Sequence, residues 1–284
     1  MNSLRLGYGL NGFAGHRLPD ACAVVAGLGY DGVALTLDQP HLDPYADDLS
    51  SEVARARDSL QRHRLAVVVE TGSRYVLDPW HKHEPTLVSE HGRERRTDLL
   101  LRAVRIAHEL DAEVMSCWSG TLPAGTSTEE GWQRVVAGLG PVLDEAAHLG
   151  VTVCFEPEPG MLVDRLESFE SLLTTVGRPD RLGLTLDLGH CVCLEDEPVA
   201  DCVRRASPRL VHVHVEDMRR GVHEHLDFGE GELDLPVALA ALEGVGYRGL
   251  VAVELSRHSH AADTVVPRAI RVLREAERME VLIP

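Results

Sequence analysis

Aromatic side chains are scarce, at 4% of the 284 residues, so Leu, Val and Ala must fill most of the core. No apolar run approaches the roughly 18 residues of a membrane-spanning helix, which excludes such a helix and gives no reason to expect a membrane partner. The N-terminal residues also lack the basic region and long apolar stretch of a signal peptide. We therefore expect a cytoplasmic protein whose six cysteines are reduced thiols.

Basic residues are outnumbered by acidic ones. The chain has 28 Lys and Arg and 45 Asp and Glu, which gives a formal net charge of −17. A protein that binds the nucleic-acid backbone needs a basic face, so this balance disfavours a nucleic-acid partner. A local basic patch or bound metal ions can offset the total. The composition therefore weighs against a nucleic-acid-binding protein without excluding one.

Apolar runs and helical segments alternate along the whole chain. Continuous runs of Val, Leu and Ile indicate strands buried on both faces, as in a parallel sheet. Eight such runs occur, at residues 4–9, 32–37, 66–71, 114–119, 152–158, 183–190, 209–217 and 250–256. Helical periodicity predicts helices at residues 19–28, 50–63, 94–110, 127–149, 166–176, 198–206, 236–244 and 261–279. The pattern predicts either a closed barrel or an open doubly wound sheet.

The positions of glycines and polar groups separate these two folds. A dinucleotide-binding sheet requires G-x-G-x-x-G after its first strand, and GYGLNGFAG (7–15) has a different spacing. Polar groups that end several strands favour the barrel, whose active site lies at the carboxyl ends of its strands. No linker or low-complexity segment divides the chain. We therefore predict one (β/α)₈ TIM-barrel domain over residues 1–284, with long loops after strands 3 and 7.

The long loops, 70–95 and 218–234, are expected to be substrate lids, although solvated surface loops are the simpler alternative. Within the first loop we select Glu70 and His83 as candidate substrate contacts. This loop also concentrates further ring-bearing and cationic residues on the expected active-site side, namely Arg74, Trp80, His81, Lys82 and His91.

Acid and imidazole groups close the last four apolar runs. They are spaced by 31, 27 and 40 residues, about one strand and helix each, and are Glu156, Asp187, His214 and Glu254. Three carboxylates and one imidazole suit Mn²⁺, Mg²⁺ or Co²⁺ better than a thiolate-preferring ion. A ring of buried ion pairs is the alternative, but these strands lack matching cations, and unpaired buried carboxylates are costly. The spacing therefore predicts a divalent-metal site.

The ordered motifs FEPEPG (155–160), LDLGH (186–190), VHVHVED (211–217) and VEL (253–255) resemble those of the xylose-isomerase-like TIM-barrel superfamily. That superfamily includes sugar phosphate isomerases and epimerases, ketose 3-epimerases, inosose dehydratases and the endonuclease IV type. The resemblance implies the same four metal ligands, with His214 chosen over His212 because it precedes x-x-Asp. Both histidines face the same way along the strand, so this choice stays open.

The resemblance also implies a reaction. Members of this superfamily often form dimers or tetramers, so a homo-oligomer is consistent with the resemblance. In the 3-epimerases two carboxylates, matched here by Glu156 and Glu254, move a proton through a metal-stabilised enediolate of a small sugar or polyol. Glu158 either binds a substrate hydroxyl or caps the next helix. His190, His225 and Arg257 are further candidate substrate contacts, and Arg257 can hold a phosphate or carboxylate. A metal-dependent polyol dehydratase would use similar chemistry, and a non-enzymatic sugar- or metal-binding barrel would bind without proton exchange.

The endonuclease IV type offers a rival interpretation. Its D-x-H motif before a G-E-G turn is matched by His223 and His225, with His replacing Asp, and His190 would complete a second metal site. A multinuclear site of this kind, typically with Zn²⁺, suits phosphoester hydrolysis. Strands 3 and 4, however, end in ETGS and CWSG, without the histidines of that branch. We therefore expect an isomerase or epimerase, with the phosphoesterase as the alternative.

Overall fold

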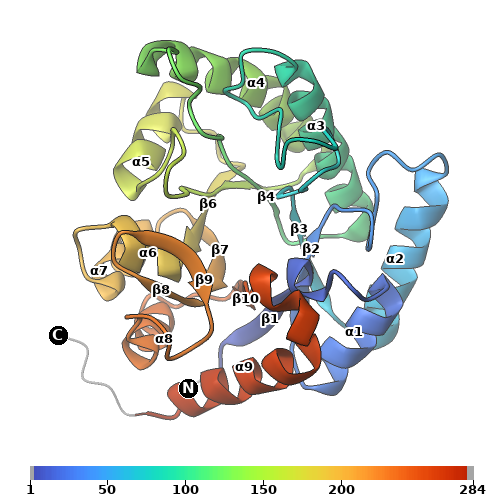
Figure 1. Cartoon of the computed structure of the whole chain (residues 1–284), viewed down its shortest axis with the longest axis vertical. Coiled ribbons are helices and arrows are strands. Elements are labelled where there is room, and N and C mark those ends of the chain that lie inside the picture. Colours follow the sequence, from blue (N-terminus) through green and yellow to red (C-terminus); the bar gives the residue numbers. More distant parts are fainter. Residues whose placement is uncertain (1–2, 280–284) are drawn as a thin grey trace.

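The computed structural model describes residues 3–279 and forms a closed barrel of eight parallel strands (Figure 1). Neighbouring strands follow the order β1-β10-β7-β6-β5-β4-β3-β2. The strands are β1 (Arg5–Gly9), β2 (Gly32–Thr36), β3 (Ala66–Glu70), β4 (Met115–Cys117), β5 (Val153–Phe155), β6 (Leu182–Asp187), β7 (Leu210–Val215) and β10 (Leu250–Val253). The predicted (β/α)₈ barrel is confirmed.

Helices surround the strands and cover the outside of the barrel (Figure 1). They are α1 (Leu18–Gly27), α2 (Leu49–His63), α3 (Arg93–Leu110), α4 (Thr128–Leu149), α5 (Leu166–Thr175), α7 (Val199–Ala206), α8 (Leu235–Gly244) and α9 (Ala262–Ala276). Local sequence sets the ends of α4, because the Ser127 side chain accepts a hydrogen bond from the Glu130 amide and Gly150 is left-handed. Within residues 3–279, none of the helices is apolar over enough of its length to cross a bilayer. All six cysteines are buried and free of disulfides.

Two elements differ from the sequence prediction. The apolar run 183–190 is not one strand: β6 ends at Asp187 and helix α6 (Leu188–Leu194) begins at once. The Asp187 carboxylate accepts a hydrogen bond from the His190 amide at 2.9 Å, which starts the helix. The loop 218–234 contains most of an antiparallel hairpin of β8 (Asp217–Arg219) and β9 (Val222–Leu226). Residues 71–92, by contrast, form an irregular loop as expected.

A buried carboxylate holds this hairpin to the chain that follows it. The Asp217 side chain is 3% exposed and accepts hydrogen bonds from the amides of Met218, Gly229 and Leu233, each at 2.9 Å. Gly231 packs directly against it, since an added Cβ would lie 2.3 Å from Asp217 Oδ1. The G-E-G turn is therefore part of the packing that fixes the hairpin.

Gly231→Ala is expected to lower the free energy of unfolding by about 1–3 kcal/mol, the usual cost of overpacking. The new methyl group would also lie 2.5 Å from the Met218 carbonyl oxygen, so the hairpin must shift. Chemical denaturation measures this change. Gly140→Ala in α4 is the control, because no atom lies within 4 Å of its added Cβ and alanine favours helix by roughly 0.5–1 kcal/mol. Equal stability of the two variants would contradict the packing described here.

Candidate active site

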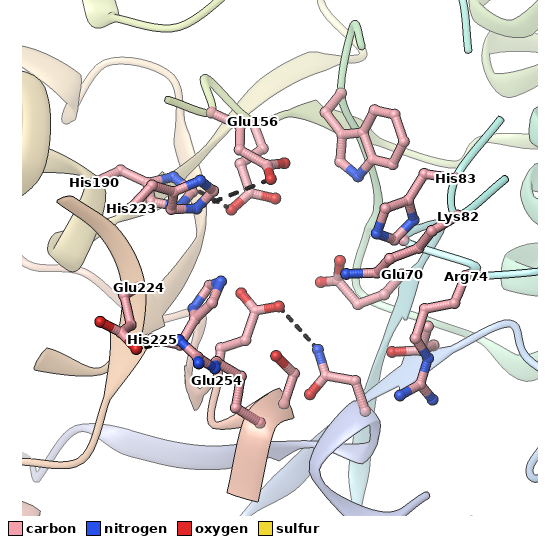
Figure 2. A pocket seen from close by; sticks show the side chains of 17 residues that line it. Glu70, Arg74, Lys82, His83, Glu156, His190, His223, Glu224, His225 and Glu254 are labelled. Atoms are coloured by element: carbon pink, nitrogen blue, oxygen red, sulfur yellow. Dashed lines mark hydrogen bonds and ion pairs between the residues drawn. The ribbon is translucent and has the colours of Figure 1, made fainter. Parts of the chain in front are cut away.

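A cavity of about 340 Å³ opens at the carboxyl ends of the barrel strands. Glu70 ends β3, Glu156 follows β5 and Glu254 follows β10, so the barrel itself directs these three carboxylates into the cavity. The loop after β3 and the β8–β9 hairpin form opposite walls, and Figure 2 shows Lys82 and His83 across the cavity from His190 and His223. Both loops predicted as lids therefore contribute to this cavity.

His214 on β7 lies at the centre of the acid groups. Its Nδ1 is 3.0 Å from Glu156 Oε1 and 3.1 Å from Glu254 Oε2, and its Nε2 is 3.1 Å from Glu70 Oε1. The four predicted metal ligands each offer one ligand atom, and these atoms lie within 4.8 Å of one another: Glu156, Asp187, His214 and Glu254. The structure therefore brings the predicted set together.

Histidine supplies the positive charge in this cluster. Within residues 3–279, the basic side chains within 4.0 Å of the Glu156, Asp187 and Glu254 carboxylates are all imidazoles, and each of these is charged only when it is protonated. Burial alone would lower the pKa of His214, but the charges of Glu254, Glu156 and Glu70 raise it well above its usual range. The cluster thus has no lysine or arginine of its own to neutralise three carboxylates.

The two glutamates beside His214 titrate differently. Burial raises the pKa of Glu156 to about 7, with Glu254 and Glu70 adding to the shift and His214 opposing it. Burial also acts to raise the pKa of Glu254, but His214, His225 and His190 outweigh it and hold that pKa well below the usual value. Carboxyl groups with separated pKa values are a common arrangement in acid–base active sites.

The cluster fits a divalent cation on structural grounds. Asp187 Oδ2 is buried and has no hydrogen-bond partner within the described residues, which costs about 1–3 kcal/mol for an unsatisfied group. Three carboxylates and one imidazole match the donors that Mg²⁺, Mn²⁺ and similar ions use. His212 is also buried, with Nε2 3.3 Å from Glu70 Oε1, and belongs with Glu70 and His214 to a separate group. The geometry therefore favours His214 as the imidazole of the four-residue set.

A second group consists of three imidazoles. His190 on α6 and His223 and His225 on β9 offer nitrogen atoms within 4.8 Å of one another. His190 Nε2 lies 3.2 Å from His223 Nε2, while His190 Nδ1 lies 3.1 Å from the Pro157 carbonyl oxygen. Because a carbonyl oxygen can only accept a hydrogen bond, Nδ1 of the neutral His190 carries the proton. Nε2 of His190 is then unprotonated and can accept a hydrogen bond from His223.

The remaining predicted contact residues also line the cavity, namely Glu70, His83, Glu158, His190, His225 and Arg257. Glu158 does not cap α5, whose N-cap is Arg165. Its pKa is raised to about 8, chiefly by burial and then by Glu156 and Glu254. Arg257 is exposed and forms an ion pair with Glu224.

The expectation for the loop after β3 was only partly right. Arg74, Lys82 and His83 line the cavity, whereas Trp80, His81 and His91 are exposed and lie outside its lining. The amides of Trp80 and His81 donate to Asp78 Oδ1 at 2.7 and 3.1 Å, which turns this segment of the loop away. Local composition did not reveal which side chains this turn would expose.

Sequence reasoning missed two groups in the cavity region. Asn11 donates from Nδ2 to Glu254 Oε1 at 2.8 Å and so orients that carboxylate. Glu216 is fully buried, lies 3.7 Å from His225 Nδ1, and has no hydrogen-bond partner for either oxygen in the described part of the chain. Asn11 lies in the glycine-rich segment 7–15, and Glu216 lies between His214 and Asp217 in the VHVHVED motif.

A closed parallel barrel with acid and imidazole groups gathered at the carboxyl ends of its strands defines the TIM-barrel class of enzymes. The sequence profile of the xylose isomerase-like TIM barrel family matches residues 22–276. The chain therefore belongs to this family.

Curated relatives include an epimerase, a dehydratase and a catabolic protein. The L-ribulose 3-epimerase of Methylomonas sp. (strain DH-1) is 28% identical over 261 residues, covering 89% of this chain and 82% of that protein. The inosose dehydratase of Klebsiella pneumoniae (strain 342) is 25% identical over 233 residues, covering 65% of this chain and 76% of that protein. The rhizopine catabolism protein MocC of Rhizobium meliloti is 33% identical over 150 residues, which is 47% of this chain and 45% of that relative. These relationships identify the chain as an enzyme of the family.

Solved structures agree on the fold. The D-allulose 3-epimerase from Methylomonas sp. in complex with D-allulose has a TM-score of 0.74 at 23% identity, over 97% of this chain and 98% of that one. The 3-keto-D-glucoside 4-epimerase YcjR from E. coli has a TM-score of 0.76 at 15% identity, over 96% and 100%. At these identities the likeness concerns the barrel and not the substrate.

Proposed function

We propose that the chain is a divalent-metal-dependent isomerase or epimerase of a small sugar or polyol. The observation that carries this proposal is the pair of carboxylates beside one imidazole nitrogen, with His214 Nδ1 3.0 Å from Glu156 and 3.1 Å from Glu254. Both carboxylates face a cavity of about 340 Å³. The epimerase names among the relatives support the same class of reaction.

The cation would be held by Glu156, Asp187, His214 and Glu254. Mn²⁺, Mg²⁺ and Co²⁺ suit this donor set, and such an ion supplies a Lewis acid that polarises a substrate carbonyl and acidifies the adjacent C–H bond. The protein's part is to keep the carboxylates oriented. Asn11 does this for Glu254 through its 2.8 Å hydrogen bond.

Proton transfer falls to the two glutamates. One of Glu156 and Glu254 removes the proton from the carbon next to the carbonyl, and the other returns a proton to the substrate. Glu158, His190 and His225 also line the cavity. We assign them to the binding of substrate hydroxyl groups. The loop after β3 and the hairpin limit access of water, which strengthens the electrostatic interactions in the cavity.

Metal content and solvent exchange test this proposal together. Protein purified without a chelator or a metal-affinity resin should contain about one Mn, Co or Mg ion per chain by elemental analysis. Incubation of the loaded protein with a panel of ketoses and aldoses in D₂O should place deuterium on a carbon next to the carbonyl, detected by NMR. Absence of bound metal after reconstitution would overturn the ligand assignment, and absence of exchange across the panel would overturn the reaction.

A multinuclear phosphoesterase is the second candidate, favoured by the three-imidazole group of His190, His223 and His225. It predicts two or three ions per chain, mainly Zn²⁺, and hydrolysis of bis(p-nitrophenyl) phosphate. A polyol dehydratase would instead bind one ion and release an unsaturated or deoxy product, which mass spectrometry identifies by the loss of water.

His225→Ala is expected to raise KM about tenfold while the metal content stays unchanged, because loss of one good hydrogen bond to substrate is worth about 1–1.5 kcal/mol. Steady-state kinetics and elemental analysis of the same preparation measure the two quantities. His258→Ala is the control, because this histidine lies after β10 outside the cavity lining. A lower metal-to-protein ratio in His225→Ala would assign this side chain to a second metal instead.

A further inference from the structure

Lys82 is the only lysine in the chain, and the other cationic side chains counted with it are all arginines. This single ammonium group lines the cavity, and Figure 2 shows its side chain extended into it from the loop after β3. An ammonium is a compact point charge with three donors on a flexible stem, unlike the planar guanidinium. The chain thus uses lysine only where a side chain faces the substrate cavity.

The backbone on both sides of Lys82 is fixed. Before it, Asp78 accepts hydrogen bonds from the amides of Trp80 and His81. After it, the His83 amide donates to the Arg74 carbonyl at 2.6 Å, and the buried Arg96 donates to the His83 carbonyl at 2.6 Å. Lys82 therefore projects from a held segment of chain, even though its own side chain is exposed.

Two other cations line the cavity, and each already has a carboxylate partner. Arg74 pairs with Asp38 at 2.8 Å, and Arg257 pairs with Glu224. Lys82 has no carboxylate oxygen within 4.0 Å among residues 3–279 and is thus the uncompensated cation of this lining. The neighbouring His83 adds no charge near neutral pH, because burial and the charge of Lys82 lower its pKa to about 4.

We propose that Lys82 binds an anionic oxygen group of the substrate, a carboxylate or a phosphate, at the end remote from the Glu156–Asp187–His214–Glu254 cluster. The substrate is then an acidic derivative of a sugar or polyol. This inference rests on the proposed function, since it concerns the same cavity. A remote position follows from charge, because the cluster's three carboxylates outweigh one divalent ion and repel an anion, whereas the wall formed by Lys82 attracts it. A neutral hydroxyl would need only a donor, and would not account for an uncompensated cation.

Because Lys82 is the only lysine, the rate of its acetylation reports on access to this one side chain. The full-length, Mn²⁺-loaded protein is treated with sulfosuccinimidyl acetate, and mass spectrometry follows the peptide that contains Lys82, with the N-terminal amine as internal reference. The probes are D-glucitol, which is neutral, D-glucitol 6-phosphate and D-gluconate. At equal concentrations we expect a phosphate or carboxylate probe to slow acetylation of Lys82 at least fivefold, with little effect of D-glucitol. The more protective anion identifies the group. Equal protection by all three probes, or protection by neither anion, would overturn the proposal.

Two variants separate charge from hydrogen bonding. Lys82→Gln keeps a donor without charge and should weaken calorimetric binding of the protective anion at least tenfold, whereas Lys82→Arg should retain it within about threefold. Undiminished binding to Lys82→Gln would overturn the proposal. Neither measurement needs turnover. If the anion protects Lys82 from acetylation but no substrate exchanges deuterium with solvent, the proposed function is wrong and the role of Lys82 stands. If substrate exchanges deuterium but no anion protects Lys82, the role of Lys82 is wrong and the proposed function stands.

Discussion

Replacing Glu254 with glutamine is expected to lower the rate of deuterium exchange into substrate by roughly 10²- to 10⁴-fold, the range for loss of a general acid or base. The carboxamide keeps the shape of the side chain, and its oxygen can still accept the hydrogen bond from Asn11. It cannot take up a proton from carbon. The rate is measured by NMR in D₂O at saturating Mn²⁺, so that weaker metal binding does not account for the loss. Full activity would rule out the proposed mechanism.

Glu224→Gln is the matched control for this variant. Its carboxylate also lines the cavity, but it pairs with the exposed Arg257 at the rim and does not belong to the four-residue cluster. We expect less than a tenfold change in the exchange rate. An equal loss in both variants would show that the effect arises from the charge of the cavity and not from Glu254 as a proton carrier.

Arg96→Met is expected to lower the free energy of unfolding by at least about 3 kcal/mol, because it leaves several buried carbonyl groups without a donor. Arg96 is 2% exposed and donates to the carbonyl oxygens of Thr71, His83 and Pro85 at 3.1, 2.6 and 3.0 Å. Its guanidinium also stacks 4.5 Å from the Trp118 ring. Burial lowers its pKa to about 10, so the group stays protonated at neutral pH. Chemical denaturation measures the loss, and limited proteolysis should cleave within residues 71–92.

Arg102→Met provides the comparison on the same helix. Arg102 stacks 4.5 Å from the Tyr45 ring and pairs with Asp98, but its side chain is 36% exposed. Ion pairs at exposed positions contribute little, so we expect a change below about 1 kcal/mol. If both arginine variants were equally stable, Arg96 would not be what holds the loop.

The barrel and its acid cluster were predictable because each signal lies within a few consecutive residues. The apolar runs predict the strands, and Glu156, Asp187 and Glu254 end their runs at intervals of one strand and helix. The start of α6 was not predictable from hydrophobicity, because the run 183–190 is largely apolar on both sides of the boundary. At the change from strand to helix, Asp187 is the N-cap and its carboxylate accepts a hydrogen bond from the His190 amide.

The loop and the hairpin that form the cavity walls were harder to predict than the acid and imidazole groups at the strand ends. Residues 71–92 have neither helical nor strand periodicity, and the His83 carbonyl is held by Arg96 of helix α3, outside this loop. Asn11 likewise reaches Glu254 across the first and last strands of the barrel. Such long-range contacts leave no periodic pattern in a single sequence, so candidate residues in the loops could be named but not placed.

The two cavity walls come from opposite halves of the chain, residues 71–92 from the first and the β8–β9 hairpin from the second, and each has its own anchor, Arg96 and Asp217. Neither anchor is a member of the acid cluster on the strands. The loop of residues 71–92 is thus encoded apart from the reactive groups, whereas the hairpin also carries His225, which lowers the pKa of Glu254. One wall can be exchanged for a homologous segment while the reactive groups stay in place, and this modularity makes the barrel a scaffold on which new substrate preferences can evolve by replacing loops.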